Sequence, residues 1–129
     1  MSGWSEQELE RVGHATELQV SSRRTDGSLR PFVTIWVVRA GDDLYVRSAY
    51  GTTNPWFRRA TASGRGRIRA DGLERDVVFR SPGSEVHGSV DAAYHHKYDR
   101  YGPRIVGSVV GPSAAAGTLQ LVPDSPEKE

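Results

Sequence analysis

One segment limits the possible folds more than any other, the run Phe32–Val38, whose sequence is Phe-Val-Thr-Ile-Trp-Val-Val. These residues favour a β-strand, and both faces of that strand are apolar or nearly so. A strand with one face in water alternates apolar and polar residues, so this pattern is typical of a strand covered on both sides. Pro31 precedes the run, where proline is tolerated because it opens the strand. The run therefore predicts a barrel strand or a strand beneath a helix.

Further short strands are marked by alternating and β-branched residues. They lie around Leu18 and Val20 and at residues 44–49, 67–70, 74–79 and 118–122. Glycine and aspartate mark tight turns at Thr25–Gly27, Gly41–Asp43 and Asp71–Gly72, and the last of these is the strongest hairpin signal in the chain. About six antiparallel strands in short hairpins leave edges that a small barrel would close.

Three short helices interrupt these strands. The first, residues 4–13, begins with the capping box of Ser5 and Glu8, and Gly13 is expected to end it. Because so short a helix is unstable by itself, it must pack on the rest of the molecule.

The other two helices follow from caps and periodicity. Asn54 and Pro55 open the second helix and Gly64 ends it. Residues 86–101 place apolar and aromatic side chains on one stripe, which predicts an amphipathic helix. The glycine- and proline-rich stretch 102–117 is expected to be rich in loops.

The length and composition indicate one globular domain. The chain has 129 residues, enough for a single core, and we expect the domain to span residues 1–123 with a disordered tail at 124–129. No apolar run approaches the roughly 18 residues of a membrane span, and the N-terminus lacks a secretory pattern, so a cytoplasmic protein without membrane contact is expected. The absence of cysteine excludes disulfides, thiolate metal sites and a cysteine nucleophile.

Metal binding and serine hydrolysis fit the sequence poorly. His87, Asp91, His95 and Asp99 share one helical face, but His87 and His95 lie about 12 Å apart on a helix that rises about 1.5 Å per residue. That separation is too large for one metal ion, so we expect no metal site and interpret these residues as a solvated face. Ser108 lacks the flanking pattern of a hydrolase nucleophile.

Nucleic-acid binding is not expected either. Fifteen of the seventeen basic residues are arginine, but the net charge is +1. Arg65, Arg67 and Arg69 form a small basic strip that we interpret as solvated, since no aromatic-interleaved motif accompanies it. Arginine binds phosphate and carboxylate through a planar fork, which suits a small anionic ligand. Coding bias would give the same composition, so a site has to be argued from position.

The segment Ser22–Arg59 gathers arginine and hydroxyl groups at strand ends, beside large aromatic residues and a helix N-terminus. Helix N-termini attract anions. Trp36 and Trp56 would offer flat apolar surfaces near these arginines, which suits a planar anionic ligand such as a flavin phosphate. The alternative is that both tryptophans are core residues and the arginines lie on the surface.

These motifs resemble the flavin split-barrel superfamily, the fold of the pyridoxamine-phosphate-oxidase-like proteins, and within it the deazaflavin-dependent nitroreductase branch. That branch has a Gly-Arg-Lys-Ser/Thr-Gly turn, an arginine that opens the next strand, an Ala-Ser-x-Gly-Gly loop and an Asn-Pro-x-Trp helix opening. From Trp4 to Val122 the chain also resembles a small family of uncharacterised, mainly bacterial domains. The resemblance implies a mainly β fold with inserted α-helices, namely a six-stranded antiparallel split β-barrel with about three short helices.

The resemblance also implies which residues bind the coenzyme. Arg24 matches the arginine of the turn, and Arg30 matches the arginine that opens the next strand. Ser48 and Gly51 match the serine and the second glycine of the loop. The helix opening is matched by Asn54, Pro55 and Trp56. Two departures stand out: Thr25 replaces the turn lysine, and Ala49-Tyr50 replaces the first x-Gly of the loop. Arg47, next to the loop serine, could compensate for the missing lysine.

Two functions remain open. In the first, the chain is an oxidoreductase that transfers a hydride to a small organic acceptor. Its deazaflavin coenzyme or FMN would lie near the two tryptophans, and Arg24, Arg30, Arg47 and Ser48 would hold the coenzyme phosphate. Tyr50 is the candidate catalytic residue, as a proton donor to substrate.

In the second function, the chain has kept the barrel and lost the coenzyme. It would bind a small anion or act as a dimeric scaffold, and the substitutions at Thr25 and Tyr50 motivate this alternative. The resemblance implies a homodimer in both cases, since the resembled sites lie at a dimer interface.

Overall fold

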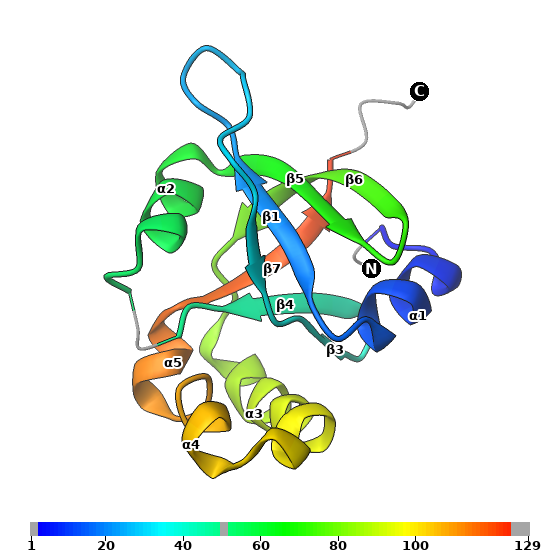
Figure 1. Ribbon diagram of the computed structural model, residues 1–129, viewed down its shortest axis with the longest axis vertical. Helices are drawn as coiled ribbons and strands as arrows, with labels where there is room; N and C mark the ends of the chain where they lie inside the picture. Colours follow the sequence, from blue (N-terminus) through cyan, green and yellow to red (C-terminus); the bar gives the residue numbers. More distant parts are fainter. Residues whose placement is uncertain (1–2, 50–51, 125–129) are drawn as a thin grey trace.

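A computed structural model describes residues 3–49 and 52–124 of the chain. Within those residues, seven strands form one antiparallel sheet in the order β2-β1-β5-β6-β7-β4-β3, which curls into a half-barrel (Figure 1). The strands are β1 (Leu18–Ser22), β2 (Val33–Ile35), β3 (Val38–Ala40), β4 (Asp43–Arg47), β5 (Arg65–Ala70), β6 (Leu73–Arg80) and β7 (Thr118–Pro123). The expectation of a mainly β barrel is confirmed.

Five α-helices and two short 3-10 turns accompany the strands in the described part of the chain. They are α1 (Glu6–His14), α2 (Pro55–Ser63), α3 (His87–Tyr98), α4 (Pro103–Val106), α5 (Pro112–Ala116), η1 (Ser84–Val86) and η2 (Asp99–Tyr101). In Figure 1, α3, α4 and α5 gather at one end of the barrel, while α2 lies on the left of the view and α1 on the right. No helix among the described residues has the length and apolar character that crossing a membrane requires.

The strand count differs from the expected six because the run Phe32–Val38 is divided. The extended pairing stops at Trp36 and Val37, so the run contributes to β2 and to β3. β2 pairs with β1 at one edge of the sheet, and β3 pairs with β4 at the other edge. One continuous segment therefore connects the two edges. Val33 and Thr34 are exposed while Val37 and Val38 are buried, so the expectation of a strand covered on both sides is wrong for β2.

Helix α3 supplies hydrogen bonds where this segment bends. The Val37 N–H donates to the Tyr98 Oη at 3.2 Å, and the Val37 carbonyl accepts from Lys97 Nζ at 2.7 Å. The Tyr98 hydroxyl itself donates to the carbonyl of Thr16 at 2.5 Å. Trp36 stacks on the Tyr98 ring with centroids 3.9 Å apart and planes within 4°. Since an unpaired buried backbone group is costly, these side chains are what allow the strand to leave its ladder.

The core has two parts. The larger part fills the barrel and includes Leu18, Val46, Ile68 and Leu121, with α1 and α2 packed against it. The smaller part lies between β3, β4 and α3, where Val90, Tyr94 and Tyr98 are fully buried among others. The apolar stripe expected for residues 86–101 is therefore confirmed in its central turns.

Local signals placed the first helix correctly, with one difference. The capping box is present, because the Glu8 N–H donates to Ser5 Oγ at 3.1 Å and the Ser5 N–H donates to Glu8 Oε1 at 2.9 Å. Gly13 does not end α1, which continues to His14. A Cβ at Gly13 would lie 3.1 Å from Arg39 Cβ, so the glycine allows α1 to approach β3 closely.

The stretch 102–117 was expected to be rich in loops, which is correct only for part of it. It contains α4 and α5, which begin at Pro103 and Pro112. Proline is tolerated in the first turn of a helix, where its missing N–H would have no partner within the helix. Residues 125–129, most of the expected tail, lie outside the described residues.

The bend at Val37 yields a stability prediction. Tyr98→Phe removes the hydroxyl that accepts from the Val37 N–H, so we expect a loss of about 1–3 kcal/mol in the free energy of unfolding, measured by urea denaturation. Tyr101→Phe is the matched control, since Tyr101 is exposed and its hydroxyl accepts a hydrogen bond from Arg100. Equal effects of the two substitutions would contradict this role for Tyr98.

A second prediction concerns acid sensitivity. Asp76 on β6 accepts hydrogen bonds from Arg67 Nε at 2.7 Å and Arg23 Nη2 at 3.2 Å. The hydrogen bond from Arg67 lowers the pKa of Asp76 below its ordinary value. The folded state therefore favours the carboxylate, and its stabilisation is present at neutral pH and is lost as the pH falls through this lowered pKa.

Asp76→Asn should cost up to about 1 kcal/mol at pH 7, because the pair is partly exposed. It should also reduce the further loss of stability between pH 5 and pH 3, measured by urea midpoints. Glu17→Gln, at an exposed position, should leave the acid response unchanged. An Asp76→Asn chain with the acid response of the wild type would sink the prediction.

Candidate functional site

Arginines line a cavity between the β1–β2 connection and helix α2. The cavity has a volume of about 420 Å³. Its lining residues are Arg23, Arg24, Thr25, Arg30, Pro55, Arg58, Arg59, Ala62 and Ser63. No carboxylate is among these residues, and we call this cavity the arginine pocket.

The β1–β2 connection holds its part of the arginine pocket through local hydrogen bonds. The Arg24 N–H donates to the Ser28 carbonyl at 2.8 Å across a turn in which Gly27 has a φ of +88°. Asp26 accepts from the Ser28 N–H at 2.9 Å and from Ser28 Oγ at 2.7 Å, and these bonds lower the pKa of Asp26. The turn predicted from Thr25–Gly27 is thus confirmed, and it brings Arg24 and Arg30 to one side of the molecule.

Helix α2 supplies the other wall. Pro55 is its first residue, and Gly64, at φ +76°, ends it as the sequence predicts. The Asn54 carbonyl accepts from the Arg58 N–H at 3.1 Å, although the Asn54 side chain makes no capping hydrogen bond. Trp56, Phe57 and Ala60 are the buried residues of α2, and the arginines at 58 and 59 are exposed.

The arginines of this pocket differ in how far they are already paired. Arg23 donates to Asp76 at 3.2 Å, and Arg24 donates to the Leu29 carbonyl at 2.9 Å. Across residues 3–49 and 52–124, Arg30, Arg58 and Arg59 have neither an ion-pair nor a side-chain hydrogen-bond partner. Three such guanidinium groups on one cavity, with no carboxylate lining it, form an environment that favours an anion.

A much smaller cavity adjoins the arginine pocket. It has a volume of about 20 Å³ and is lined by Arg30, Arg59, Trp56 and Pro31 among others. A space of this size holds about one water molecule, so it cannot take an aromatic ring. Trp56 itself is 8% exposed and belongs to the barrel core.

The structure does not bring Trp36 to the arginine pocket. Trp36 packs in the smaller core part, stacked on Tyr98 and beside Tyr101. It lines neither the pocket nor its small neighbour. The expected arrangement of two tryptophans beside one set of arginines is therefore not what the fold produces.

Arg47 also lies elsewhere, because its guanidinium is buried and already fully engaged. Its side chain has no exposure and forms an ion pair with Asp91 of α3. Arg47 Nε donates to Thr118 Oγ1 at 2.8 Å, and Nη1 donates to the Val109 carbonyl at 2.9 Å. These contacts leave Arg47 no free face for a phosphate, so its expected role as a replacement for the turn lysine has to be corrected.

Of the remaining candidate residues in the loop after β4, the structure describes Ser48. Ser48 is fully buried, and its Oγ has no hydrogen-bond partner among the described residues. Its N–H donates to the Gly117 carbonyl at 3.0 Å, which holds it against the end of α5. Tyr50, the candidate catalytic residue, and Gly51 lie outside the described residues.

Sequence reasoning missed two pocket residues, Arg58 and Arg59. The signal was present, because Trp56, Phe57 and Ala60 form the apolar face of a short helix. Residues 58 and 59 must then lie on the other face, on the same helix as the matched Asn-Pro-x-Trp opening. Their convergence with Arg24 and Arg30 depends on how α2 packs on β1, which the pattern does not specify.

The charged face of α3 was expected to be solvated, and this is wrong for Asp91. Asp91 pairs with Arg47, whereas His95 and Asp99 form an exposed pair at 2.8 Å. No group of three histidine, cysteine or acidic side chains within the described ranges is arranged to hold a metal ion.

The basic strip on β5 is matched by carboxylates. Arg67 pairs with Asp76 at 2.7 Å, Arg69 with Glu74 at 2.5 Å, and Arg65 with Asp124 at 2.9 Å. This neutralisation distinguishes the strip from the arginine pocket.

Comparison with known protein families identifies the family of this chain. Residues 8–121 match the family described as "Uncharacterized protein conserved in bacteria (DUF2255)". The chain belongs to this family. The match covers most of the split barrel of this DUF2255 chain, from within α1 into β7. A search of curated proteins finds no match.

Solved structures share the fold at low sequence identity. The heme storage protein HutZ from Vibrio cholerae is 16% identical with a TM-score of 0.64, and the match covers 93% of this chain and 90% of HutZ. An F420 reductase is 14% identical with a TM-score of 0.57, covering 95% and 97%. An FAD-binding protein from Mesorhizobium loti is 16% identical with a TM-score of 0.54, covering 95% and 91%. These likenesses establish the fold, which is a split β-barrel.

The buried ion pair of Arg47 and Asp91 gives a prediction about stability. Asp91→Ala leaves the Arg47 guanidinium buried without its carboxylate, so the free energy of unfolding should fall by about 3 kcal/mol. Asp99→Ala removes the acid of an exposed pair on the same helix and should cost no more than about 0.5 kcal/mol. Urea denaturation of both variants tests this, and a small loss for Asp91→Ala would mean that water already solvates Arg47.

Proposed function

We propose that this chain binds a phosphate-bearing flavin-type coenzyme, a deazaflavin or FMN, through the arginine pocket and acts as a cytoplasmic oxidoreductase. The observation that carries the proposal is the convergence of Arg30, Arg58 and Arg59 on a cavity of about 420 Å³ that no carboxylate lines. The substrate would be a small organic acceptor that receives a hydride. The folds of the F420 reductase and of the FAD-binding protein support this choice of coenzyme class.

The contrast with other arginines of the chain supports a ligand role. Arg39, Arg65, Arg67, Arg69 and Arg75 each lie beside a carboxylate of the chain. The arginines of the pocket that lack partners would gain charge-assisted hydrogen bonds from a phosphate. Arg24, already fixed by the Leu29 carbonyl at 2.9 Å, would meet that phosphate with little loss of side-chain freedom.

The coenzyme ring requires more surface than this part of the chain offers. The cavity beside Trp56 has only about 20 Å³, so the ring would lie outside it, along the outer edge of the arginine pocket. We propose that a second copy of the chain covers the ring, in a homodimer. Such an arrangement would exclude water from the reacting face.

The chemistry in this proposal belongs to the coenzyme, which supplies hydride transfer when it is bound. The pocket arginines orient it by holding the phosphate. Tyr50, four residues before Asn54, remains the proposed proton donor to substrate. A tyrosine would need its pKa lowered from about 10 by its surroundings to serve well at neutral pH.

Binding measurements test the proposal. We expect FMN or a deazaflavin coenzyme to quench tryptophan fluorescence with a micromolar Kd. Arg30→Ala and Arg59→Ala should each weaken binding at least about tenfold, equivalent to about 1.4 kcal/mol. Arg104→Ala is the matched control, because Arg104 is an exposed arginine on α4 that does not line the pocket.

Riboflavin provides the ligand control, since it has the ring of FMN without the phosphate. It should bind at least about tenfold more weakly than FMN, because charge-assisted bonds to the phosphate are lost. Equal affinities for riboflavin and FMN, or equal effects of Arg104→Ala and Arg30→Ala, would contradict a phosphate site in the arginine pocket.

A further inference from the structure

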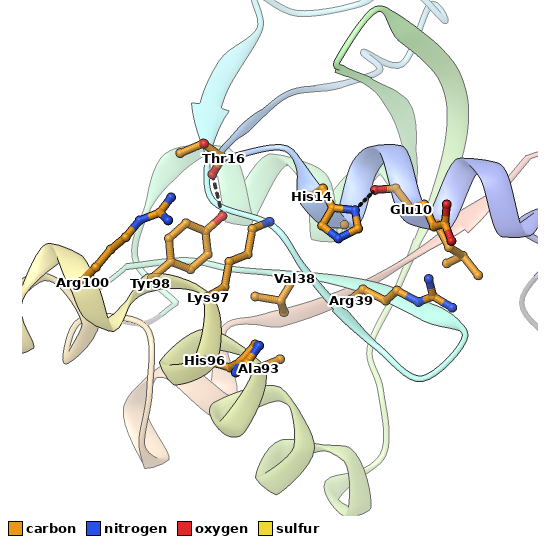
Figure 2. A pocket seen from close by; sticks show the side chains of 12 residues that line it. Glu10, His14, Thr16, Val38, Arg39, Ala93, His96, Lys97, Tyr98 and Arg100 are labelled. Atoms are coloured by element: carbon orange, nitrogen blue, oxygen red, sulfur yellow. Dashed lines mark hydrogen bonds between the residues drawn. The ribbon is translucent and has the colours of Figure 1, made fainter.

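A second cavity lies between α1, β3 and α3, and it shares no lining residue with the arginine pocket. Its volume is about 420 Å³. Leu9, Val38 and Ala93 provide apolar wall, and basic side chains lie around them. Figure 2 shows these side chains, with Lys97 and Tyr98 on one side and His14 on the other.

Lys97 occupies an unusual position in this cavity. The chain has two lysines, and this one lies on a mostly buried helix face with its Nζ 2.7 Å from the Val37 carbonyl. The Nζ is 5.1 Å from the centroid of the Tyr98 ring. None of the described carboxylates forms an ion pair with Lys97. The amine is therefore held in place without a counter-charge.

The charged groups around Lys97 are mainly basic. The elements packed here contribute Glu10 and His14 from α1, Arg39 from β3, and His96, Tyr98 and Arg100 from α3 and η2. Arg39 is already paired with Glu6 at 3.1 Å. Burial and the charge of Arg100 lower the pKa of Lys97 to about 8. At pH 7 about one amine in ten is then neutral, far more than for a lysine with an ordinary pKa of about 10.4.

We propose that this cavity binds small aldehydes or 2-oxo acids that carry an anionic group, and that Lys97 condenses with their carbonyl group. The apolar wall of Leu9, Val38 and Ala93 would take the carbon part of such a ligand. His96 and Arg100, both at exposed positions on the same cavity, would face its carboxylate. A neutral amine beside cationic groups is the arrangement that Schiff-base lysines use.

The reaction needs no oxidant or reductant. The lone pair of the neutral Nζ forms a bond to the carbonyl carbon, and the π pair of the carbonyl moves to oxygen. The nitrogen gives up two protons and the oxygen takes up two, the C–O bond breaks with loss of water, and the amine and the carbonyl compound yield an imine and one water. The Val37 carbonyl, as an acceptor for Nζ–H, keeps the amine at a fixed place during the first step.

The test uses the full-length chain and its second lysine as an internal reference. The chain is incubated at pH 7 with glyoxylate and cyanoborohydride, which reduces imines to stable amines, and the modified lysines are quantified by peptide mass spectrometry. Lys97 should be modified more than about tenfold faster than Lys128, because more of its amine is neutral. The rate at Lys97 should rise with a midpoint near pH 8.

Three controls separate the cavity from simple amine reactivity. The preference for Lys97 should disappear when the chain is unfolded in urea. Glycolaldehyde, a neutral aldehyde of similar size, should show a smaller preference than glyoxylate, and Arg100→Gln should reduce the ratio of the glyoxylate rate to the glycolaldehyde rate. Modification of Lys97 no faster than Lys128, a preference that persists in urea, or an unchanged ratio in Arg100→Gln would overturn the proposal.

Discussion

The backbone of Val37 is the point on which the rest of the fold depends. Its N–H and carbonyl belong to neither edge ladder, and Tyr98 and Lys97 of α3 satisfy them at 3.2 and 2.7 Å. Because of this, the seven-residue run Phe32–Val38 can pair at both edges of the sheet, and the chain itself connects the two edge strands β2 and β3. The same contacts fix α3 against β3, so the position of the smaller core part follows from a single bend.

This bend also separates two sides of the molecule. On the α3 side, Arg47 is buried and paired with Asp91, and the cavity at Lys97 lies between α1, β3 and α3. On the α2 side, Arg30, Arg58 and Arg59 point at a cavity that no carboxylate lines. This difference in pairing is the basis for proposing an anionic coenzyme on the α2 side, with its ring on further surface.

Elements defined by neighbouring residues could be predicted from the sequence. The capping box of α1, the Asn54-Pro55 opening of α2 and the Asp71-Gly72 hairpin all depend on contacts within a few residues, and all are present. The pairing of Arg47 with Asp91 joins residues 44 positions apart, and the stacking of Trp36 on Tyr98 depends on how α3 packs. No local pattern distinguishes a buried arginine with such a partner from one that faces a ligand. The local turn signal predicts that Arg24 and Arg30 lie near each other. Arg58 and Arg59 line the same cavity only because of how α2 packs on β1.

The most direct test of the coenzyme site observes the arginines themselves. In a chain labelled with ¹⁵N-arginine, the Nε–Hε signals can be followed by NMR while FMN or a deazaflavin coenzyme is added. The account predicts that the signals of Arg24, Arg30, Arg58 and Arg59 shift together and saturate with the ligand, while that of buried Arg47 stays in place. Shifts centred on Arg39 and Arg100, or no shift with either coenzyme, would contradict it.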